Sequence, residues 1–453
     1  MASTYLSKTP ASAGNRTKWT FAAWVKRAGG GDVGIFVAGA SGVGGSKEST
    51  IRFETASILS WQEYNGSGFD SHIKTHQKFR DPSAWYHLVF AYDSANATAA
   101  LRCRIWVNGI ELTNANGDFG TYVEAGSSYE TAINNNVIHN IGAQSWNTSN
   151  RFNGCMSHVH FTDGYAYTAS DFGEFDATSG IWKIKTGPSV TYGTNGFFVL
   201  KDAFSGTDQS GENNDWTTNG TGTTTKDNPS NNFATFNPSC KGDNAYTNSN
   251  LTATTDSNNW HSAVSSLCVG GGKWYVEYKW NATGGTNFGI ADARSIDLFG
   301  QGEMGYKPTG ALGDSVGWYG NSGAASADVK KNGVQDYVCE TYDAGDIISI
   351  ALDCDNGAVY FRKNGAAWQN SGDPTSGATR TGAVEITTGE TYFFGGTTYT
   401  SGCNISANYG NGYFGTTDVT SAVADGDGIG RFEYAPPTGY YTLCTKNIKA
   451  YGG

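Results

Sequence analysis

An alternating strand followed by a tight turn is the feature of this sequence that most constrains its fold. Within residues 345–368, Ile348, Ile350 and Leu352 alternate with small or polar side chains, and a period of two is typical of a half-buried β-strand. Asn356-Gly357 follows, before a second expected strand over residues 358–362. Asn-Gly supplies the two positive-φ residues that a type I′ hairpin needs. The segment therefore predicts an antiparallel meander.

The same pattern recurs in the first half of the chain. Residues 101–107 alternate and end at Asn108-Gly109, and Asn364-Gly365 is expected to close a further turn before Trp368. The chain has 62 glycines, 9 prolines and 13% aromatic residues. Many short strands joined by many turns give such a composition, and no run of 11–18 residues has a helical period. We therefore predict an all-β protein.

Charge and cysteine usage exclude several classes of protein. The net charge is −11, with the acidic excess in residues 186–453, and no basic stripe is present to neutralise phosphates, so we expect no nucleic-acid partner. No segment approaches 18 apolar residues, so we expect no membrane insertion. Residues 1–10 lack the apolar stretch of a signal peptide. An even number of cysteines permits disulfides, but we expect buried free thiols in a reducing cytoplasm. The eight are Cys103, Cys155, Cys240, Cys268, Cys339, Cys354, Cys403 and Cys444.

Changes in composition along the chain predict three regions. Residues 1–186 and 248–453 show repeated strand patterns and are expected to form two β-sandwich domains, the second with a C-terminal tail. Residues 187–247 are largely polar and are expected to form a bridge between them. Short apolar islands inside this bridge, at 197–200 and 233–236, are expected to dock on a domain.

Patterns within the first region predict several strands and one loop. Residues 85–93 are apolar on both faces, which is typical of a strand inside a two-layer sandwich. Residues 29–45 are rich in glycine and are expected to form a loop. Further strands are expected at 17–27, 50–62 and 72–79.

The first region resembles a LamG-like domain of the concanavalin A type. The resemblance rests on TKWTFAAWVKR (17–27), WYHLVFAYD (85–93), RIWVNGIEL (104–112) and FNGCMSHVHFTD (152–163). It implies a jelly-roll sandwich. The last region resembles a SPRY domain, through GKWYVEYKW (272–280), FGIAD (288–292), VGWYG (316–320), the opening 345–368 segment and NYGNGYF (408–414), in that order. Together these imply two jelly-roll or concanavalin A-like sandwiches joined by the bridge.

Three further segments resemble virion proteins of tailed bacteriophages. They are YLSKTPASAGNRTKWTFAAWVKR (5–27), the bridge NNDWTTNGT (213–221) with DNPSNNFATFNP (227–238), and the tail FEYAPPTGYYTLCTKNI (432–448). The resemblance implies a component of a phage particle of the tail-fibre, short-appendage or head-decoration type. Its partners would be other virion subunits, and copies of the chain would assemble around a symmetry axis. Its location would be the exterior of the virion, after assembly in the host cytoplasm.

The function implied is non-enzymatic recognition of a host surface, with a glycan as the expected ligand. Two alternatives stay open: a capsid or tail decoration protein that cements other virion subunits, and a glycan-cleaving depolymerase. Jelly-roll glycosidases carry an E-x-D-x-x-E pattern on one strand. Glu174-Phe175-Asp176 begins this pattern, but Ser179 stands where the last glutamate should be. We therefore assign no catalytic residue.

Candidate metal ligands have plainer explanations. Asp353 and Asp355, or Asp425 and Asp427, could offer oxygen ligands to calcium, but aspartates also form turns and neither run completes an EF-hand loop. His158 and His160 lie two apart on one strand, facing the same side, and could bind metal with His139 or His87. Histidines of this kind are more often satisfied by hydrogen bonds. We assign no metal and no cofactor, with calcium left as an unsupported alternative.

Aromatic residues near expected strand ends are the better functional signal. Exposed aromatic rings stack on the apolar faces of sugars or anchor protein interfaces. The alternative for each ring is that it fills a sandwich core. The predicted ligand-binding residues are Trp61, Tyr64, Trp146, Trp260, Trp318, Tyr319 and Trp368.

Overall fold

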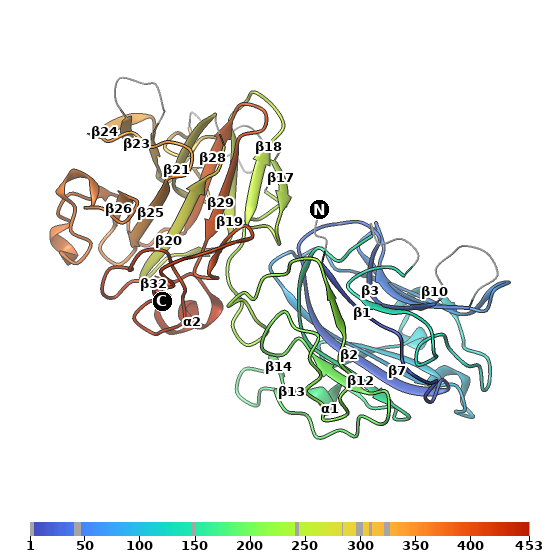
Figure 1. Cartoon of the computed structure of the whole chain (residues 1–453). Helices are drawn as coiled ribbons and strands as arrows, with labels where there is room; N and C mark the ends of the chain where they lie inside the picture. The colour runs from blue at the N-terminus through green and yellow to red at the C-terminus, as the bar shows by residue number, and fades with distance from the viewer. Residues whose placement is uncertain are drawn as a thin grey trace. The chain divides into compact units, whose positions relative to one another are not determined.

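A computed structural model describes residues 4–39, 47–145, 150–240, 244–282, 284–295, 302–307, 310–320 and 327–452. The chain divides into two compact units, Met1–Thr224 and Thr225–Gly453, and each is described by itself (Figure 1). The boundary falls inside the expected bridge, which is shared between the units. This follows from the apolar islands: Phe197–Val199 pairs with a strand of the first unit, and Phe236 forms a bridge to Ser265 of the second.

The first unit is a sandwich of two antiparallel sheets, which confirms the predicted all-β class. One sheet has eight described strands in the order β10-β6-β5-β4-β3-β11-β1-β16, and the other has six in the order β15-β12-β2-β7-β8-β9. The bounds of the first sheet are β10 (Phe119–Val123), β6 (Phe69–Lys78), β5 (Ile58–Tyr64), β4 (Glu48–Phe53), β3 (Val33–Gly39), β11 (His139–Ile141), β1 (Tyr5–Lys8) and β16 (Thr217–Asn219). Those of the second are β15 (Phe197–Val199), β12 (Gly154–Asp163), β2 (Lys18–Arg27), β7 (Trp85–Asp93), β8 (Cys103–Val107) and β9 (Ile110–Leu112).

The strand predicted over residues 85–93 is β7, with the same bounds, and its two faces pack on different clusters. Leu88, Phe90 and Tyr92 lie in the core between the sheets. Val89 and Ala91 face a smaller cluster under the short helix α1 (Ala169–Phe172) and the hairpin β13 (Gly173–Phe175)–β14 (Trp182–Ile184). The apolar character of both faces is therefore a consequence of cover on both sides.

Two expectations in the first unit were wrong. The glycine-rich segment 29–45 contains β3, whose described residues are all buried, and residues 40–46 lie outside the described part of the chain. Glycine is needed in this strand because a Cβ at Gly34 would lie 2.6 Å from the carbonyl of Ala143. The single strand expected over 50–62 is two strands, β4 and β5, joined by a turn at 54–57.

The second unit repeats this two-sheet design with different strand bounds. In the larger sheet the order is β17-β18-β29-β20-β25-β26-β27, with β32 pairing to β20 in parallel. Its strands are β17 (Asn244–Thr247), β18 (Thr252–Thr255), β29 (Asn404–Asn408), β20 (Lys273–Trp280), β25 (Ile347–Asp353), β26 (Ala358–Lys363), β27 (Val384–Glu385) and β32 (Tyr441–Thr442).

The other sheet of the second unit ends in a free edge. Its order is β19-β28-β21-β22-β23-β24, so β24 is an edge strand, and Val334 and Val338 on it are exposed. The strands are β19 (His261–Val269), β28 (Tyr392–Tyr399), β21 (Gly285–Asp292), β22 (Ser315–Tyr319), β23 (Ala327–Lys331) and β24 (Val334–Cys339); a small hairpin, β30 (Tyr413–Phe414)–β31 (Thr417–Asp418), and the helix α2 (Thr445–Tyr451) complete the unit.

The Asn-Gly turns differ from one another. Asn108-Gly109 links β8 and β9 directly, and both residues have positive φ (48° and 81°), as a type I′ turn requires. In the turn between β25 and β26 only Gly357 has positive φ, and four residues separate the strands. The type I′ turn predicted at Asn356-Gly357 is therefore wrong. Asp353 accounts for the longer turn, because its carboxylate accepts hydrogen bonds from the backbone and side-chain amides of Asn356.

Candidate ligand-binding face of the first unit

Strands β4, β5 and β6 lie side by side in the eight-stranded sheet, and their register sorts their side chains onto two faces. Ile51, Trp61 and Ile73 are partners across the three strands and are buried in the core. Because side chains alternate along a strand, the neighbouring positions face away from the core. These side chains, which we call the β4–β6 face, are Glu48, Thr50, Arg52, Ser60, Gln62, Tyr64, His72 and Lys74, with Glu54 just beyond β4. Phe69 joins them because a register shift between Glu63 and Tyr64 places it opposite Tyr64. Thr50, Ser60 and Gln62 are buried among their neighbours on this face.

Charged and amide groups on the β4–β6 face are tied to one another. Glu54 accepts a hydrogen bond from Arg52 (3.1 Å) and one from Lys74 (2.9 Å). Gln62 Nε2 lies 3.0 Å from His72 Nε2. The guanidinium Nε of Arg52 is buried and has no partner among the described residues. The face therefore presents positively charged, negatively charged and neutral hydrogen-bonding groups that hold one another in place.

An aromatic group lies next to these polar side chains. Phe69 is 48% exposed, and its ring centroid is 5.6 Å from that of Tyr64 and 4.4 Å from that of His72. Packing on two other rings holds the Phe69 ring while one side of it stays open to solvent. A rigid, exposed ring beside oriented polar groups is the combination that saccharide recognition uses.

Burial shifts the pKa values of the titratable groups on the β4–β6 face. It raises the pKa of Glu48, a shift that a hydrogen bond from Thr50 partly opposes. It lowers the pKa of His72, and the charge of Lys74 lowers it further, so this ring is neutral at pH 7. Burial opposes ionisation of Glu54 as well, but Lys74 and Arg52 outweigh it and the pKa of Glu54 is lowered. The face thus holds an ionised acid between two cations.

The two glutamates of the face are too far apart for glycoside hydrolysis. Glu48 and Glu54 lie six residues apart on extended chain, roughly 20 Å at about 3.3 Å per residue. The carboxyl pairs of glycosidases are about 5–9.5 Å apart. The other sequence candidate is a turn: Asp176 accepts hydrogen bonds from the backbone amides of Thr178 and Ser179. Glu48 and Glu54 therefore do not form the carboxyl pair of a glycosidase.

The seven aromatic residues predicted from the sequence divide into three groups. Trp61 and Trp318 have no exposed surface and fill the two cores; the expectation that they are exposed was wrong, because each points inward in its strand. Tyr64, Trp260, Tyr319 and Trp368 are half-buried, and a ligand role for them stays a prediction. Trp146 lies outside the described residues. The sequence reasoning missed Phe69, Gln62 and His72, although alternation in 58–64 could have placed Gln62 and Tyr64 on one outward face.

His87 and His158, two of the histidines considered as metal ligands, have structural roles. His158 has a positive φ (49°) at a shift of register between Ser157 and His160, and its ring lies 6.4 Å from that of His160. His87 accepts a hydrogen bond from Trp182 Nε1 (3.1 Å) and stacks on Trp24. Burial lowers the pKa of His87 to about 3 and that of His158 to about 4.

The aspartates considered as calcium ligands have structural roles in turns and loops. Within the described ranges, no group of three or more His, Cys, Asp or Glu side chains is placed to hold a metal ion. Asp425 accepts hydrogen bonds from the backbone amides of Ile429, Gly430 and Thr442, and Asp355 accepts one from Gly272. The eight cysteines are free thiols. In the part of the chain that is described, no helix is long and apolar enough to cross a bilayer.

An enclosed space in the first unit is too small for a sugar. It has a volume of about 10 Å³, room for about one water molecule. Phe36, Phe161, Phe197 and Trp216 supply its apolar wall. This space therefore does not hold a sugar.

Comparison with known proteins places the fold of the first unit. The model of the concanavalin A-like lectin/glucanases superfamily matches residues 2–171. These residues have a LamG-type, concanavalin A-like fold. The β4–β6 face lies inside the matched range.

Solved structures are similar to parts of this chain or to most of it. The SPRY domain of human HERC1 is 18% identical, with a TM-score of 0.29, over 38% of this chain and 96% of that chain. A heptameric SAP-like pentraxin from Limulus polyphemus is 15% identical, with a TM-score of 0.27, over 37% and 72%. Domains LG4-5 of the mouse laminin alpha1 chain are 7% identical, with a TM-score of 0.28, over 89% and 86%. No curated protein matches the chain in sequence.

Proposed function

We propose that this chain is a non-enzymatic recognition protein on the exterior of a bacteriophage particle, a tail fibre or short appendage, and that it binds host-surface glycan through the β4–β6 face. The observation that carries the proposal is the exposed ring of Phe69 packed on His72, which contacts Gln62, with the Arg52–Glu54–Lys74 group further along the same strands. A sugar stacks its apolar face on such a ring and exchanges hydrogen bonds with the polar groups. The lectin-type fold family of residues 2–171 supports it.

A matched pair of phenylalanines tests the proposal. Phe69 and Phe175 are exposed to the same degree, 48% and 49%, on different elements of the first unit. On an array of host polysaccharides, Phe69→Ala is expected to weaken binding by about tenfold, roughly 1.4 kcal/mol, while Phe175→Ala binds as the parent does. Equal binding by both variants, or no glycan bound by the parent, would refute glycan recognition at this face.

A cement or decoration protein is the second candidate, and the hairpin β13–β14 favours it. Phe175 (49% exposed) and Ile181 (67%) project from this hairpin, and exposed apolar groups in proximity suit a protein partner. Here Phe175→Ala is expected to lower occupancy on the particle while glycan binding is kept. Antibody labelling viewed by electron microscopy separates the two: label at the tail tip supports recognition, and label over the head lattice supports decoration.

Assembly and chemistry provide two further checks. We infer a homo-oligomer, because appendages of particles sit on symmetry axes, and light scattering on the purified chain is expected to give a multiple of 48.1 kDa.

A depolymerase would release reducing ends from host polysaccharide. We expect no release, and sustained release would replace the binding proposal by the enzymatic one.

A further inference from the structure

A segment of the second unit, residues 302–307 between β21 and β22, packs on the outer face of the six-stranded sheet. Met304, at its centre, has no exposed surface and packs on Val264 and Ala291. Glycine makes room for it, because a Cβ at Gly395 would lie 2.3 Å from Met304 Cε. Thr397 Oγ1 accepts the Met304 amide at 3.0 Å. The loop is thus anchored at a fixed point of the sheet.

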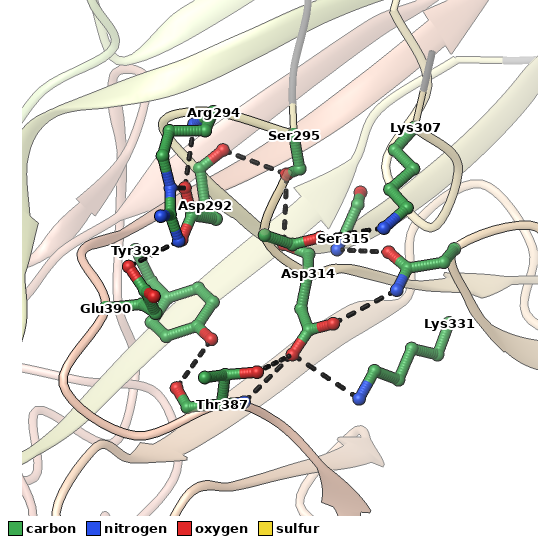
Figure 2. A network of polar contacts seen from close by, with 12 residues as sticks. Asp292, Arg294, Ser295, Lys307, Asp314, Ser315, Lys331, Thr387, Glu390 and Tyr392 are labelled. Carbon is green, nitrogen blue, oxygen red and sulfur yellow. Dashed lines mark hydrogen bonds and ion pairs between the residues drawn. The ribbon is translucent and has the colours of Figure 1, made fainter. Parts of the chain in front are cut away.

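The polar network of Figure 2 fixes the chain beside this loop. Asp314 accepts hydrogen bonds from the Thr387 amide (2.8 Å) and from Asn332 (3.0 Å), and pairs with Lys331 at 3.4 Å. The next residue, Ser315, accepts the amide of Gly305 at 2.9 Å. Both oxygens of Asp314 are occupied, so the network is a support that holds neighbouring side chains in place.

A group that we call the tyrosine cluster lies beside Met304: Glu303, Tyr306, Tyr319 and Lys330. The rings of Tyr306 and Tyr319 meet edge to face at 5.6 Å. Lys330 Nζ donates to Tyr306 Oη (3.0 Å) and lies 4.6 Å from the centre of the Tyr319 ring. Tyr319 donates its hydroxyl to the Met304 carbonyl. Tyr306 is 37% exposed, so the cluster reaches the surface.

Asn287 supplies an unused acceptor under this cluster. Its side chain has no exposed surface, and its Nδ2 donates to Glu303 Oε1 at 3.4 Å, near the limit of a hydrogen bond. Its Oδ1 has no partner among the described residues. A buried acceptor without a donor costs about 1–3 kcal/mol, and such an atom calls for an explanation. Rotation of Glu303, which breaks this long bond and the contact of its carboxylate with Tyr319, would uncover it.

The cluster has more acceptors than donors. Its one cation, Lys330, is already engaged with Tyr306 and lies 3.9 Å from Asp328. Burial raises the pKa of Glu303, although a hydrogen bond from Tyr319 and the charge of Lys330 oppose the shift. An anionic ligand would meet the carboxylate of Glu303, with that of Asp328 nearby, and the one cation in the cluster, Lys330, is already engaged. A neutral ligand rich in hydroxyl groups supplies the missing donors.

We propose that the tyrosine cluster is a second ligand site and that it takes a neutral saccharide. Hydroxyl groups of the sugar donate to Asn287 Oδ1 and to the Glu303 carboxylate, and the sugar ring stacks on the exposed side of Tyr306. The site lies in the second unit and uses none of the residues of the β4–β6 face. Two sites in one chain would add avidity on a surface that carries many sugars.

Two tyrosines of equal exposure allow a controlled test on the full chain. Tyr306 and Tyr399 are each 37% exposed. Saturation-transfer NMR is run with methyl glycosides of glucose, galactose and mannose as probes. Tyr306→Ala and Tyr399→Ala are compared in the parent and in the Phe69→Ala background, which removes the stacking ring of the β4–β6 face.

The expected result is transfer to at least one glycoside that Tyr399→Ala keeps and Tyr306→Ala weakens at least tenfold, in both backgrounds. Glu303→Gln, nearly the same in shape, is expected to weaken it severalfold, so the test does not depend on one variant that fails to fold. Equal signals from the Tyr306 and Tyr399 variants, or no transfer in the Phe69→Ala background, would overturn the second site. A loss caused by Phe69→Ala alone reports on the β4–β6 face instead.

Discussion

Each unit buries one glutamate completely, and the two differ in what surrounds it. In the first unit, Glu63 accepts hydrogen bonds from Ser49 Oγ and Trp61 Nε1. In the second, Glu277 accepts four, from the amides of Glu433 and Tyr434, from Tyr275 Oη and from Asn408. Burial raises the pKa of Glu63 to about 8 and that of Glu277 to about 7. Burial sets the direction of both shifts, and the number of donors limits their size.

The comparison also shows what each carboxyl does. Glu63 holds the edge of the first core, where Ser49 in turn accepts the amides of Ala132 and Ile133. Glu277 ties the C-terminal segment at residues 433–434 to β20. Replacing Glu63, which has two donors, and Glu277, which has four, should therefore lower the free energy of unfolding by unequal amounts.

The largest difference between the units is expected in acid. Burial lowers the pKa values of His87, His139, His158 and His160, all in the first unit. The unfolded chain binds protons more readily, so stability present above pH 6.5 is lost as the pH falls, by up to about 1.4 kcal/mol per pH unit for each histidine. The second unit has one histidine, His261. Calorimetry from pH 7 to 4.5 should show one transition falling steeply, and parallel falls of two transitions would contradict this.

Glu277→Gln should have the next largest effect. An amide nitrogen cannot accept hydrogen bonds, so two of the four donors lose their partner, at about 2–4 kcal/mol in all. Urea unfolding at pH 6 measures the change. Glu63→Gln is the matched control and is expected to cost about 1 kcal/mol, because fewer donors are affected. Equal losses would mean that donor number does not distinguish the sites.

Glu63→Gln should act mainly on the pH dependence of the first unit. A raised pKa means that the folded state keeps a proton that the unfolded state releases, so this contribution is full below pH 4.5 and is lost as the pH rises through about 8. The parent should lose about 1.4 kcal/mol per pH unit relative to the variant between these limits. Free energies of unfolding from pH 5.5 to 8.5 test it; parallel curves would show that Glu63 does not titrate as described.

Tyr275→Phe should have the smallest effect. It removes one donor from Glu277, at about 1 kcal/mol, and burial is then less well opposed, so the pKa of Glu277 moves from about 7 toward that of Glu63. The pH at which the second unit has fully lost the contribution of Glu277 to its free energy of unfolding should rise accordingly. Arg362 keeps its bond to the Ala435 carbonyl, so the C-terminal segment stays in place. An unchanged limit would show that Tyr275 contributes nothing to the ionised state.

The class of fold followed from local sequence, since alternation and Asn-Gly turns are short-range signals. β7 was placed by its pattern alone, and so was the turn at Asn108-Gly109. The pattern failed where a side chain changes the backbone, as Asp353 does in the turn after β25. It also failed at β3, where glycines serve close packing inside a strand.

The candidate site was harder to predict, because it depends on pairing between strands. Alternation tells which residues share a face of one strand, but only the register brings Gln62 opposite His72. The burial of Trp61 and Trp318 illustrates the same limit, since an aromatic near a strand end points inward or outward according to a one-residue difference. The sequence does not indicate that Phe69 is exposed. Its contacts with Tyr64 and His72 form only when β5 and β6 pair in the folded sheet.

The free edge at β24 has a practical consequence for the behaviour of the protein in concentrated solution. An edge strand that is paired on one side and carries exposed valines is a template on which another extended chain can add by backbone hydrogen bonds. Asp336, between Val334 and Val338, places a charge in the middle of that template. The negative charge of Asp336 opposes the addition of another chain at β24, and acidic conditions that neutralise this charge weaken that protection.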